Sequence, residues 1–222
     1  MDVLAMIDEA RRECNVLEHP FYQRWSTGEL RAEELGFYAG EYRHAVVALA
    51  DASDGVVAKV GAEHRAGLER HAAEERSHIA LWDEFAAAAA GEERSRREPL
   101  SETRQCAQAW TSGEDALEQL AVLYAIEASQ PAIAKTKLDG LVDRYGYSPE
   151  GPAVEYFELH ATLDVEHARQ AGELIEALMS KDEGEASAQA DRMVARANAA
   201  LRGNWKLLDG VDEQFAHAGS RD

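Results

Sequence analysis

Nearly the whole chain carries the hydrophobic periodicity of α-helices, and this feature restricts its fold more than any other. Apolar residues recur at intervals of three and four, and the helix-favouring residues Ala, Leu, Glu and Arg dominate the composition. Only five of the 222 residues are proline. Long helices joined by short connections predict an all-α bundle. The expected helices cover about 2–15, 29–53, 56–90, 101–111, 113–146, 150–181 and 184–213.

Short polar stretches separate these helices. STGEL at 26–30 offers Ser26 or Thr27 as an N-cap for the helix that follows, and GEERSRREPLS at 91–101 is predicted to be a loop. No shift in composition and no internal repeat marks a second domain. We therefore predict one helical domain over 1–215 and a flexible tail over 216–222.

The overall charge excludes some classes of partner. Acidic residues outnumber basic ones by 42 to 23, and the formal net charge is −19. Such a field repels nucleic acid and anionic lipid surfaces, so we predict neither as a partner. No run of 18 apolar residues is present, which predicts that no segment spans a membrane.

The N-terminal stretch and the cysteines bear on localisation. MDVLAMIDEARREC is acidic where a signal peptide is basic. The two cysteines, Cys14 and Cys106, form no CxxC motif and are too few for a disulfide framework. We expect a cytoplasmic protein.

The stretch FELHATLDVEHARQ at 157–170 places two imidazoles and a carboxylate on one helical stripe. At 100° per residue, His160, Asp164 and His167 lie within about 60° of one another on the helical wheel. Imidazoles and carboxylates are ligands of first-row transition metals. Each histidine alone also suits a surface or core position, but the three together favour a metal site.

A second helix offers ligands with the spacing of helix-bundle metal centres. RHAAEERSHIALWDEF at 70–85 holds Glu75 and His78 three residues apart, the Glu-x-x-His arrangement of di-metal bundles. Glu74 is the alternative to Glu75, which we prefer because its offset puts it about 60° from His78 on the wheel. His71 lies one heptad before His78 and is a candidate for a supporting position beside the ligands.

Glu127 lies inside the apolar run LAVLYAIE, where an unpaired carboxylate is expensive to bury. It is therefore predicted to coordinate a metal, with a buried salt bridge to Arg or Lys as the alternative. Pro131 follows four residues later and removes the hydrogen bond to the carbonyl of Glu127. We expect a kink or bulge in the backbone beside this ligand.

Together these helices supply three carboxylates and three imidazoles. The carboxylates offset most of the charge of two divalent cations, and one hydroxide, peroxide or substrate anion completes the balance. Nitrogen and oxygen ligands favour iron or manganese, whereas a closed zinc site favours cysteine. The predicted ligands are Glu75, His78, Glu127, His160, Asp164 and His167.

The pattern of carboxylates followed by His-x3-Asp-x2-His resembles the haem-oxygenase-like di-metal oxidases and oxygenases. The similarity is greater to one branch, that of the chlamydial protein associating with death domains (CADD) and its bacterial relatives, and it extends over most of the chain. The resemblance implies a single seven-helix domain with the haem-oxygenase-like (TenA/PqqC-like) fold. The similar segments include LEHPFYQRWSTGELRAEELGFYAGEY at 17–42, HIALW at 78–82, IEASQPAIAKTKLDGLVDRYGYS at 126–148 and YFELHATLDVEHAR at 156–169.

The resemblance also implies a function. This branch makes para-aminobenzoate for folate biosynthesis from a tyrosine of the protein itself, with a lysine as the expected nitrogen donor. The matching residues are Tyr22 in HPFYQRW, Lys137 in AKTKLDGL and, as a second tyrosine nearby, Tyr38 in GFYAGEY. The resemblance thus implies a non-haem di-metal oxidoreductase with Fe/Fe or Fe/Mn, O2 as co-substrate and an external reductant.

The residues themselves leave several points open. Tyr22 and Trp25 also suit core packing, Lys137 also suits a surface position, and Lys135 is the alternative amine. An oxidase acting on an external amino or fatty acid is the alternative function. The sequence chooses neither between Fe/Fe and Fe/Mn nor between oligomeric states, and a homodimer is the expected assembly.

Metal-free proteins of the same fold are a further alternative, but the groups they need are not evident. A thiaminase-like hydrolase requires an activated thiolate, and neither Cys14 nor Cys106 has a base nearby in the sequence. A haem-degrading enzyme requires an axial histidine, for which His19 is the early candidate. A non-catalytic interaction module leaves the six predicted ligands unexplained.

Overall fold

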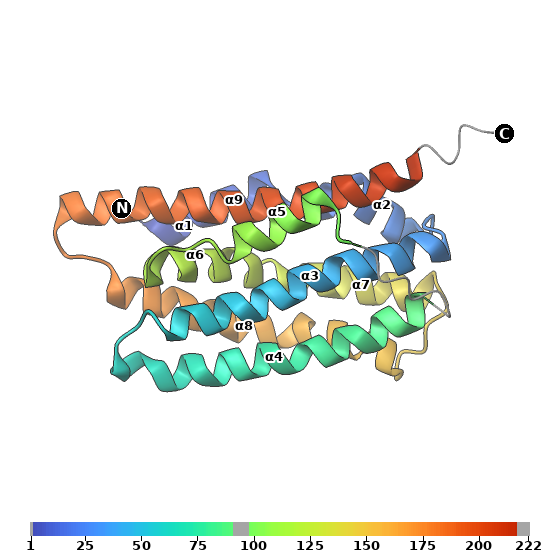
Figure 1. Cartoon of the computed structure of the whole chain (residues 1–222), viewed down its shortest axis with the longest axis horizontal. Coiled ribbons are helices and arrows are strands. Elements are labelled where there is room, and N and C mark those ends of the chain that lie inside the picture. Colours follow the sequence, from blue (N-terminus) through green and yellow to red (C-terminus); the bar gives the residue numbers. More distant parts are fainter. Residues whose placement is uncertain (1, 91–97, 217–222) are drawn as a thin grey trace.

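The computed structural model describes residues 2–90 and 98–216, and helices account for most of them (Figure 1). No strand occurs within these residues, which confirms the predicted all-α fold. The elements are α1 (Val3–Glu13), a 3₁₀ turn η1 (Val16–Glu18), α2 (Pro20–Thr27), α3 (Ala32–Val57), α4 (Ala62–Ala90), α5 (Ser101–Trp110), α6 (Ala116–Glu127), α7 (Gln130–Asp143), α8 (Pro152–Leu178) and α9 (Glu183–Ala216).

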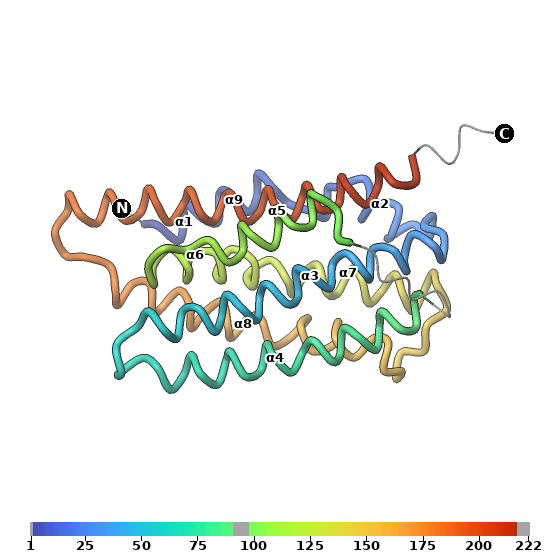
Figure 2. The backbone as a smooth tube through the Cα atoms, viewed as in Figure 1, coloured from blue at the N-terminus to red at the C-terminus, as the bar shows by residue number. Residues whose placement is uncertain are grey.

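Four long helices define the long axis of the molecule. α3 packs along α4, α8 lies against α4, and α9 extends along the other side beside α1 and α5 (Figure 1). The turns from α3 to α4 and from α8 to α9 lie at the same end of the bundle, and α7 joins α8 at the opposite end (Figure 2).

The shorter α6 lies in the interior, in contact with α3, α8 and α9. It is buried along nearly its whole length, which explains why its sequence is apolar on every side. None of the described helices, α6 included, has both the length and the apolar character needed to cross a membrane.

Helix α2 lies in a stretch for which the sequence predicts no helix. His19 caps it: Nδ1 accepts a hydrogen bond from the N–H of Phe21 at 3.0 Å, so Nε2 carries the proton and donates to Asp209 of α9 at 3.0 Å. Pro20 occupies the first position, where a missing N–H costs nothing, and Gly28 ends the helix with φ 80°. Eight residues are too few for a periodicity to be recognised, so the capping groups define α2.

The prediction that Ser26 or Thr27 caps the next helix is wrong. Both residues belong to the last turn of α2, where their hydroxyls donate to carbonyls of the preceding turn. The cap of α3 is Arg31 instead, whose N–H donates to Glu34 Oε2 at 3.1 Å. Serine and threonine satisfy backbone groups at either end of a helix, and the sequence alone does not decide which.

The helix expected over 113–146 is divided into α6 and α7. Pro131, the second residue of α7, has no N–H to donate to the carbonyl of Glu127, so the predicted distortion is a complete break at Ala128 and Ser129. Arg11 of α1 donates to the carbonyl of Ala128 and, at 3.0 Å, to Ser129 Oγ. This division and the addition of α2 account for the difference from the seven expected helices.

The predicted loop and tail fall largely outside the described residues. Residues 91–97 of the loop 91–101 and residues 217–222 of the tail 216–222 are not described, and residue 216 is the last residue of α9. The buried apolar side chains contributed by α1 to α9 form one cluster.

A close contact between α2 and α7 brings Tyr22 toward Lys137. Trp25 Nε1 donates to the carbonyl of Lys137 at 3.1 Å. Gly140 lies directly against the indole, and a methyl group at this position would stand 2.5 Å from Trp25 Cδ1. The absence of a side chain at Gly140 therefore lets the two helices approach.

Replacement of Gly140 by alanine is predicted to lower the free energy of unfolding by about 1–3 kcal/mol, because the added methyl group displaces a fully buried Trp25. Gly67 of α4 is the matched control, since open space surrounds its missing Cβ. Gly67→Ala should raise the stability by about 0.5–1 kcal/mol through helix propensity. Urea unfolding of both variants measures the difference, and equal effects would contradict the close contact.

Candidate metal centre

The six ligands predicted from the sequence lie in one buried cluster between α4, α6 and α8. The side chains are each no more than 4% exposed. α4 contributes Glu75 and His78, the last turn of α6 contributes Glu127, and α8 contributes His160, Asp164 and His167.

Glu75 and Asp164 connect the histidines of this cluster. Glu75 Oε1 lies 3.2 Å from His78 Nδ1 and 3.6 Å from His167 Nδ1. Asp164 Oδ2 lies 2.9 Å from His160 Nδ1, and its Oδ1 lies 3.6 Å from His167 Nδ1. Glu75 thus joins α4 to α8 across the interior of the bundle, and Asp164 connects His160 with His167 within α8.

His71 belongs to the cluster itself. The sequence analysis considered it only as a residue that supports the ligands from beside them, and the structure places it closer. Its Nε2 lies 2.9 Å from Glu127 Oε1 and 3.8 Å from Glu75 Oε1. The signal in the sequence is the spacing of His71, Glu75 and His78, which places all three on one face of α4. That spacing does not show which side chains on this face of α4 meet the ligands of α6 and α8.

Two overlapping groups of donor atoms are close enough to hold two cations. One group consists of His71, Glu75 and His167, and the other of Glu75, His78 and His160; within each, the donor atoms lie within 4.8 Å of one another. Glu75 belongs to both groups and would therefore be a ligand common to the two sites.

The donor atoms of the cluster fit a metal site better than a hydrogen-bond network. Seven of them are buried without a hydrogen-bond partner among the described residues, and each such atom costs about 1–3 kcal/mol if left unsatisfied. They approach one another without hydrogen-bond alignment, which is the arrangement of ligands around a cation. The atoms are His71 Nε2, Glu75 Oε1, His78 Nδ1, Glu127 Oε1 and Oε2, His160 Nε2 and His167 Nδ1.

Protons compete with metal ions for this cluster. Burial raises the pKa of the Glu127 carboxyl. Burial also opposes a charged His71, but the neighbouring Glu127 and Glu75 outweigh it and raise the pKa of the imidazole to about 9. The metal-free pair of His71 and Glu127 therefore holds a proton at neutral pH, which a bound cation must displace.

Glu74, the alternative ligand, lies on the outer side of the cluster. Its side chain is 47% exposed, and its Oε2 lies 3.2 Å from His167 Nε2. The other ring nitrogen of His167 faces Glu75. The geometry favours Glu75 as the ligand and Glu74 as the residue that orients the imidazole from behind.

Tyr22, Tyr38 and Lys137 meet in a neighbouring buried cluster. The Tyr22 and Tyr38 hydroxyls are 2.9 Å apart, and Lys137 Nζ lies 5.3 Å from the centre of the Tyr22 ring. Lys137 is 1% exposed and is therefore not a surface lysine. Lys135, the alternative amine, is exposed and pairs with Asp139 at 2.8 Å.

The interior changes the protonation of Lys137. Burial alone lowers its pKa to about 7, because the charged ammonium loses its hydration and gains no carboxylate in return. A large fraction of this amine is therefore neutral near pH 7.

Aromatic rings connect the two clusters. Trp82 lies one turn after His78 on α4, and Tyr156 lies one turn before His160 on α8. The Tyr156 ring centre lies 4.2 Å from that of His160 and 4.9 Å from that of Trp82, which in turn lies 6.1 Å from Tyr38. Ring contacts thus run without interruption from the histidines to Tyr38.

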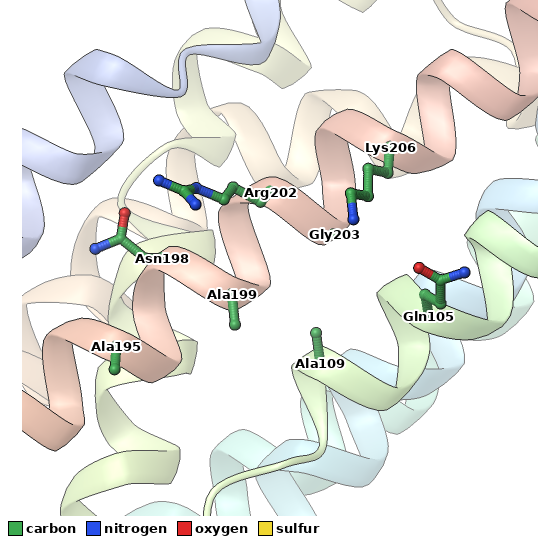
Figure 3. A pocket seen from close by; sticks show the side chains of 8 residues that line it. All are labelled: Gln105, Ala109, Ala195, Asn198, Ala199, Arg202, Gly203 and Lys206. Carbon is green, nitrogen blue, oxygen red and sulfur yellow. The ribbon is translucent and has the colours of Figure 1, made fainter.

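A groove of about 550 Å³ lies between α5 and α9 (Figure 3). None of its lining residues belongs to either cluster. Its lining contains neither carboxylates nor imidazoles, so it is not a metal site. The lining residues are Gln105, Ala109, Ala195, Asn198, Ala199, Arg202, Gly203 and Lys206.

The cysteines that a thiaminase-like hydrolase would use and the histidine that a haem-degrading enzyme would use are not suited to these roles. Burial raises the pKa of both Cys14 and Cys106, the opposite of what a nucleophilic thiolate requires. Both ring nitrogens of His19 are engaged, one by the N–H of Phe21 and one by Asp209. The imidazole is therefore not available as a haem ligand.

Known proteins match this chain over most of its length. Residues 37–202 match the family described as iron-containing redox enzymes. A 4-aminobenzoate synthase of Chlamydia muridarum is 34% identical in an alignment of 209 positions that covers 89% of this chain and 87% of that protein. A protein of the same name from Nitrosomonas europaea is 28% identical, with 94% and 90% of the two chains covered.

Solved structures have the same fold. A TenA homologue from Pseudomonas syringae has a TM-score of 0.78 at 16% identity, with 95% of this chain and 91% of that chain covered. A domain with a haem-oxygenase-like fold from Shewanella denitrificans has a TM-score of 0.74 at 19% identity, with 99% and 93% covered. These similarities confirm the haem-oxygenase-like fold expected from the resemblance.

Glu75→Gln is predicted to abolish binding of both metal ions, because this carboxylate is common to the two donor groups. Glu74→Gln is the matched control: the amide oxygen can still accept a hydrogen bond from His167, so metal binding should fall by no more than about tenfold. Metal content after loading with Fe(II) and Mn(II) and desalting measures both. Equal losses in the two variants would contradict the assignment.

Lys137→Met is predicted to stabilise the metal-free protein by roughly 2–4 kcal/mol at pH 7, because the ammonium is disfavoured in the folded state but free in the unfolded chain, where its pKa is about 10.4. The gain should shrink as the pH rises toward that value, since the amine is then neutral in both states. Urea unfolding between pH 7 and 10 tests this. A destabilising effect at pH 7 would show that Lys137 makes favourable contacts that outweigh its burial.

Proposed function

The chain belongs to the family of haem-oxygenase-like, iron-containing redox enzymes, and from this premise we propose that it is a self-sacrificing 4-aminobenzoate synthase. In this proposal Tyr22 is the source of the aromatic ring, Lys137 is the source of the amino group, and O2 is the oxidant. The names of the relatives from Chlamydia and Nitrosomonas support the product.

We propose that the buried cluster holds two divalent metal ions, either Fe/Fe or Fe/Mn. The unpartnered donor atoms support this, as does the carboxylate of Glu75 that is shared between the two groups. When bound, such a pair supplies the reduction of O2 and hence the oxidising power for cleaving the tyrosine side chain, with an external reductant providing further electrons. The proposed ligands are His71, Glu75, His78, Glu127, His160, Asp164 and His167.

The observation that carries the proposal is the position of the Lys137 amine, which is buried among other side chains 5.3 Å from the Tyr22 ring centre. Burial of an unpaired lysine is unfavourable, and an apolar residue of similar size fills such a space without that penalty. The two groups that must combine in 4-aminobenzoate are thus held together where water is excluded.

Tyr38 keeps the Tyr22 phenol in place. The hydroxyls are 2.9 Å apart, and burial raises the pKa of both phenols well above the usual value. Both hydroxyls are therefore protonated at neutral pH, and Tyr38 provides a hydrogen-bond partner for the Tyr22 hydroxyl.

The aromatic contacts provide a path for electrons between Tyr22 and the metal ligands. Successive ring centres from Tyr22 through Tyr38, Trp82 and Tyr156 to His160 are separated by 4.2–6.3 Å. An electron removed from Tyr22 therefore crosses the interior through ring contacts.

Isotope labelling tests the source of both parts of the product. Protein labelled with ¹³C-tyrosine and ¹⁵N-lysine is loaded with iron and manganese without oxygen and is then given O2 and a reductant. Mass spectrometry should detect 4-aminobenzoate carrying both labels and a loss of mass from the peptide containing Tyr22. Tyr22→Phe should abolish the product. Turnover of an external substrate by Tyr22→Phe would instead establish an oxidase.

The two lysines provide a matched comparison. Lys137→Gln should lower the yield of 4-aminobenzoate by about 100-fold or more, because the amine is removed from the reacting position. Lys135→Gln changes an exposed side chain only two residues away and should leave the yield nearly unchanged. The reverse result would transfer the role of nitrogen donor to Lys135.

A further inference from the structure

Five aromatic rings surround the Lys137 amine, and the nearest belongs to Tyr42. Nζ lies 4.4 Å from the centre of the Tyr42 ring, compared with 5.3–5.7 Å for the rings of Tyr22, Tyr38, Trp82 and Phe157. The face of an aromatic ring attracts an ammonium group electrostatically and packs against the neutral amine. Tyr42 therefore makes the closest aromatic contact with Nζ.

Tyr42 differs from the other rings in where its polar group points. The hydroxyls of Tyr22 and Tyr38 pair with each other, and Trp82 Nε1 donates to the carbonyl of Ala39 at 2.8 Å. The Tyr42 hydroxyl instead meets the side chains of Gln130 and Asn204; Gln130 Nε2 donates to it at 3.5 Å. Its ring thus faces the lysine while its hydroxyl is held from α7 and α9.

Other rings fix the plane of Tyr42. The ring centre of Tyr38, one turn earlier on α3, lies 5.2 Å away, and that of Trp82 lies 5.1 Å away. Trp110 of α5 contacts Tyr42 edge-on at 6.4 Å. With 1% exposure and neighbours on several sides, Tyr42 has little freedom to turn.

Gln130 and Asn204, the side chains that hold the Tyr42 hydroxyl, border a small cavity. It has a volume of about 20 Å³ and lies at the break between α6 and α7, where Cys14, Ser129, Gln130 and Asn204 form part of its lining. Asn204 is 7% exposed, and its Oδ1 has no hydrogen-bond partner among the described residues. A cavity of this size accommodates one water molecule, and Asn204 Oδ1 is an acceptor for it.

Gln130, which holds the Tyr42 hydroxyl, and Lys137 both belong to α7. Gln130 and Lys137 are separated by seven residues, which places them on the same face about 10 Å apart along the axis. Side chains of a helix lean toward its N-terminus, so the long stem of Lys137 extends in the direction of Gln130 and brings Nζ back over Tyr42.

We propose that Tyr42 is the positioning residue of the reaction: its ring face holds the Lys137 amine beside Tyr22, and Gln130, Asn204 and one bound water molecule hold its hydroxyl. The inference rests on the proposed function, in which that amine enters the product. Tyr42 itself contributes no atom to 4-aminobenzoate. Without the Tyr42 ring, Tyr22 can still be consumed, but the Lys137 amine is no longer held beside it.

Nuclear magnetic resonance of the metal-free protein tests the geometry without turnover. The chain has five lysines, so ¹³Cε-lysine labelling gives few signals, and Lys137→Gln identifies the one from Lys137. The nearby ring faces shift its Hε signals upfield. Tyr42→Leu should remove a larger part of this shift than Phe157→Leu, whose ring lies farther away. Tyr42→Phe keeps the ring but loses the hydroxyl that Gln130 and Asn204 hold, so it should remove a smaller part than Tyr42→Leu. An unchanged shift in Tyr42→Leu would overturn the inference.

Product partition tests the role in the reaction. The quantity measured is the amount of 4-aminobenzoate formed for each Tyr22 lost. Tyr42→Leu should lower this ratio at least tenfold, and Tyr42→Phe should keep it within about twofold of the wild type. A structural defect alone lowers product and Tyr22 loss together and leaves the ratio unchanged, a result that would overturn the inference.

The anchor is tested separately. Asn204→Leu removes the acceptor for the water molecule and fills the cavity, and should shift the Lys137 signals in the same direction as Tyr42→Leu, by a smaller amount. Circular dichroism verifies that each variant is folded.

The two proposals fail in different ways. If the wild type makes no labelled 4-aminobenzoate, the proposed function is wrong, while the Lys137 signals still test the position of the amine. If labelled product forms and its ratio to Tyr22 loss is unchanged in Tyr42→Leu, the function is retained and the positioning role of Tyr42 is wrong.

Discussion

The mutual approach of buried carboxylates and imidazoles where α4, α6 and α8 meet is the constraint on which the rest of the structure depends. Glu75, Glu127 and Asp164 bring negative charge into the interior, and such groups are tolerated only when they are paired or bound to a cation. The helices that carry them must therefore be packed with little freedom. The same packing fixes the neighbouring turns, including Trp82 on α4 and Tyr156 on α8.

The interior of the bundle contains two adjoining clusters that differ in polarity. One is rich in charge and in unpartnered donor atoms, whereas the other is lined by aromatic rings around a single amine, Lys137. The first suits cations, and the second favours the neutral form of lysine because burial lowers its pKa to about 7. Ring contacts join the two, and in the proposed function they connect the metal ligands with Tyr22 without opening the protein to solvent.

Much of this arrangement could be predicted from residue spacing. The alignment of His160, Asp164 and His167 on one face of α8 follows from 3.6 residues per turn, and the unfavourable burial of Glu127 in an apolar helix pointed to a special role. His71 was not predicted as a direct member, although it shares the face of Glu75 and His78. Helix α2 was not predicted because eight residues show no recognisable periodicity and because its first turn depends on the imidazole of His19, which bonds to Asp209, 190 residues away.

The sequence by itself determined the helical class and the faces of α4 and α8 that carry the ligands, because both depend on local periodicity. It also determined the interruption beside Glu127, since a proline cannot donate the missing hydrogen bond. Only the tertiary structure decided that Glu74 lies on the outer side of the cluster, behind His167, and that Lys137 rather than Lys135 is buried. These choices depend on which elements pack together, here α4 against α8 and α7 against α2, and no spacing within one helix contains that information.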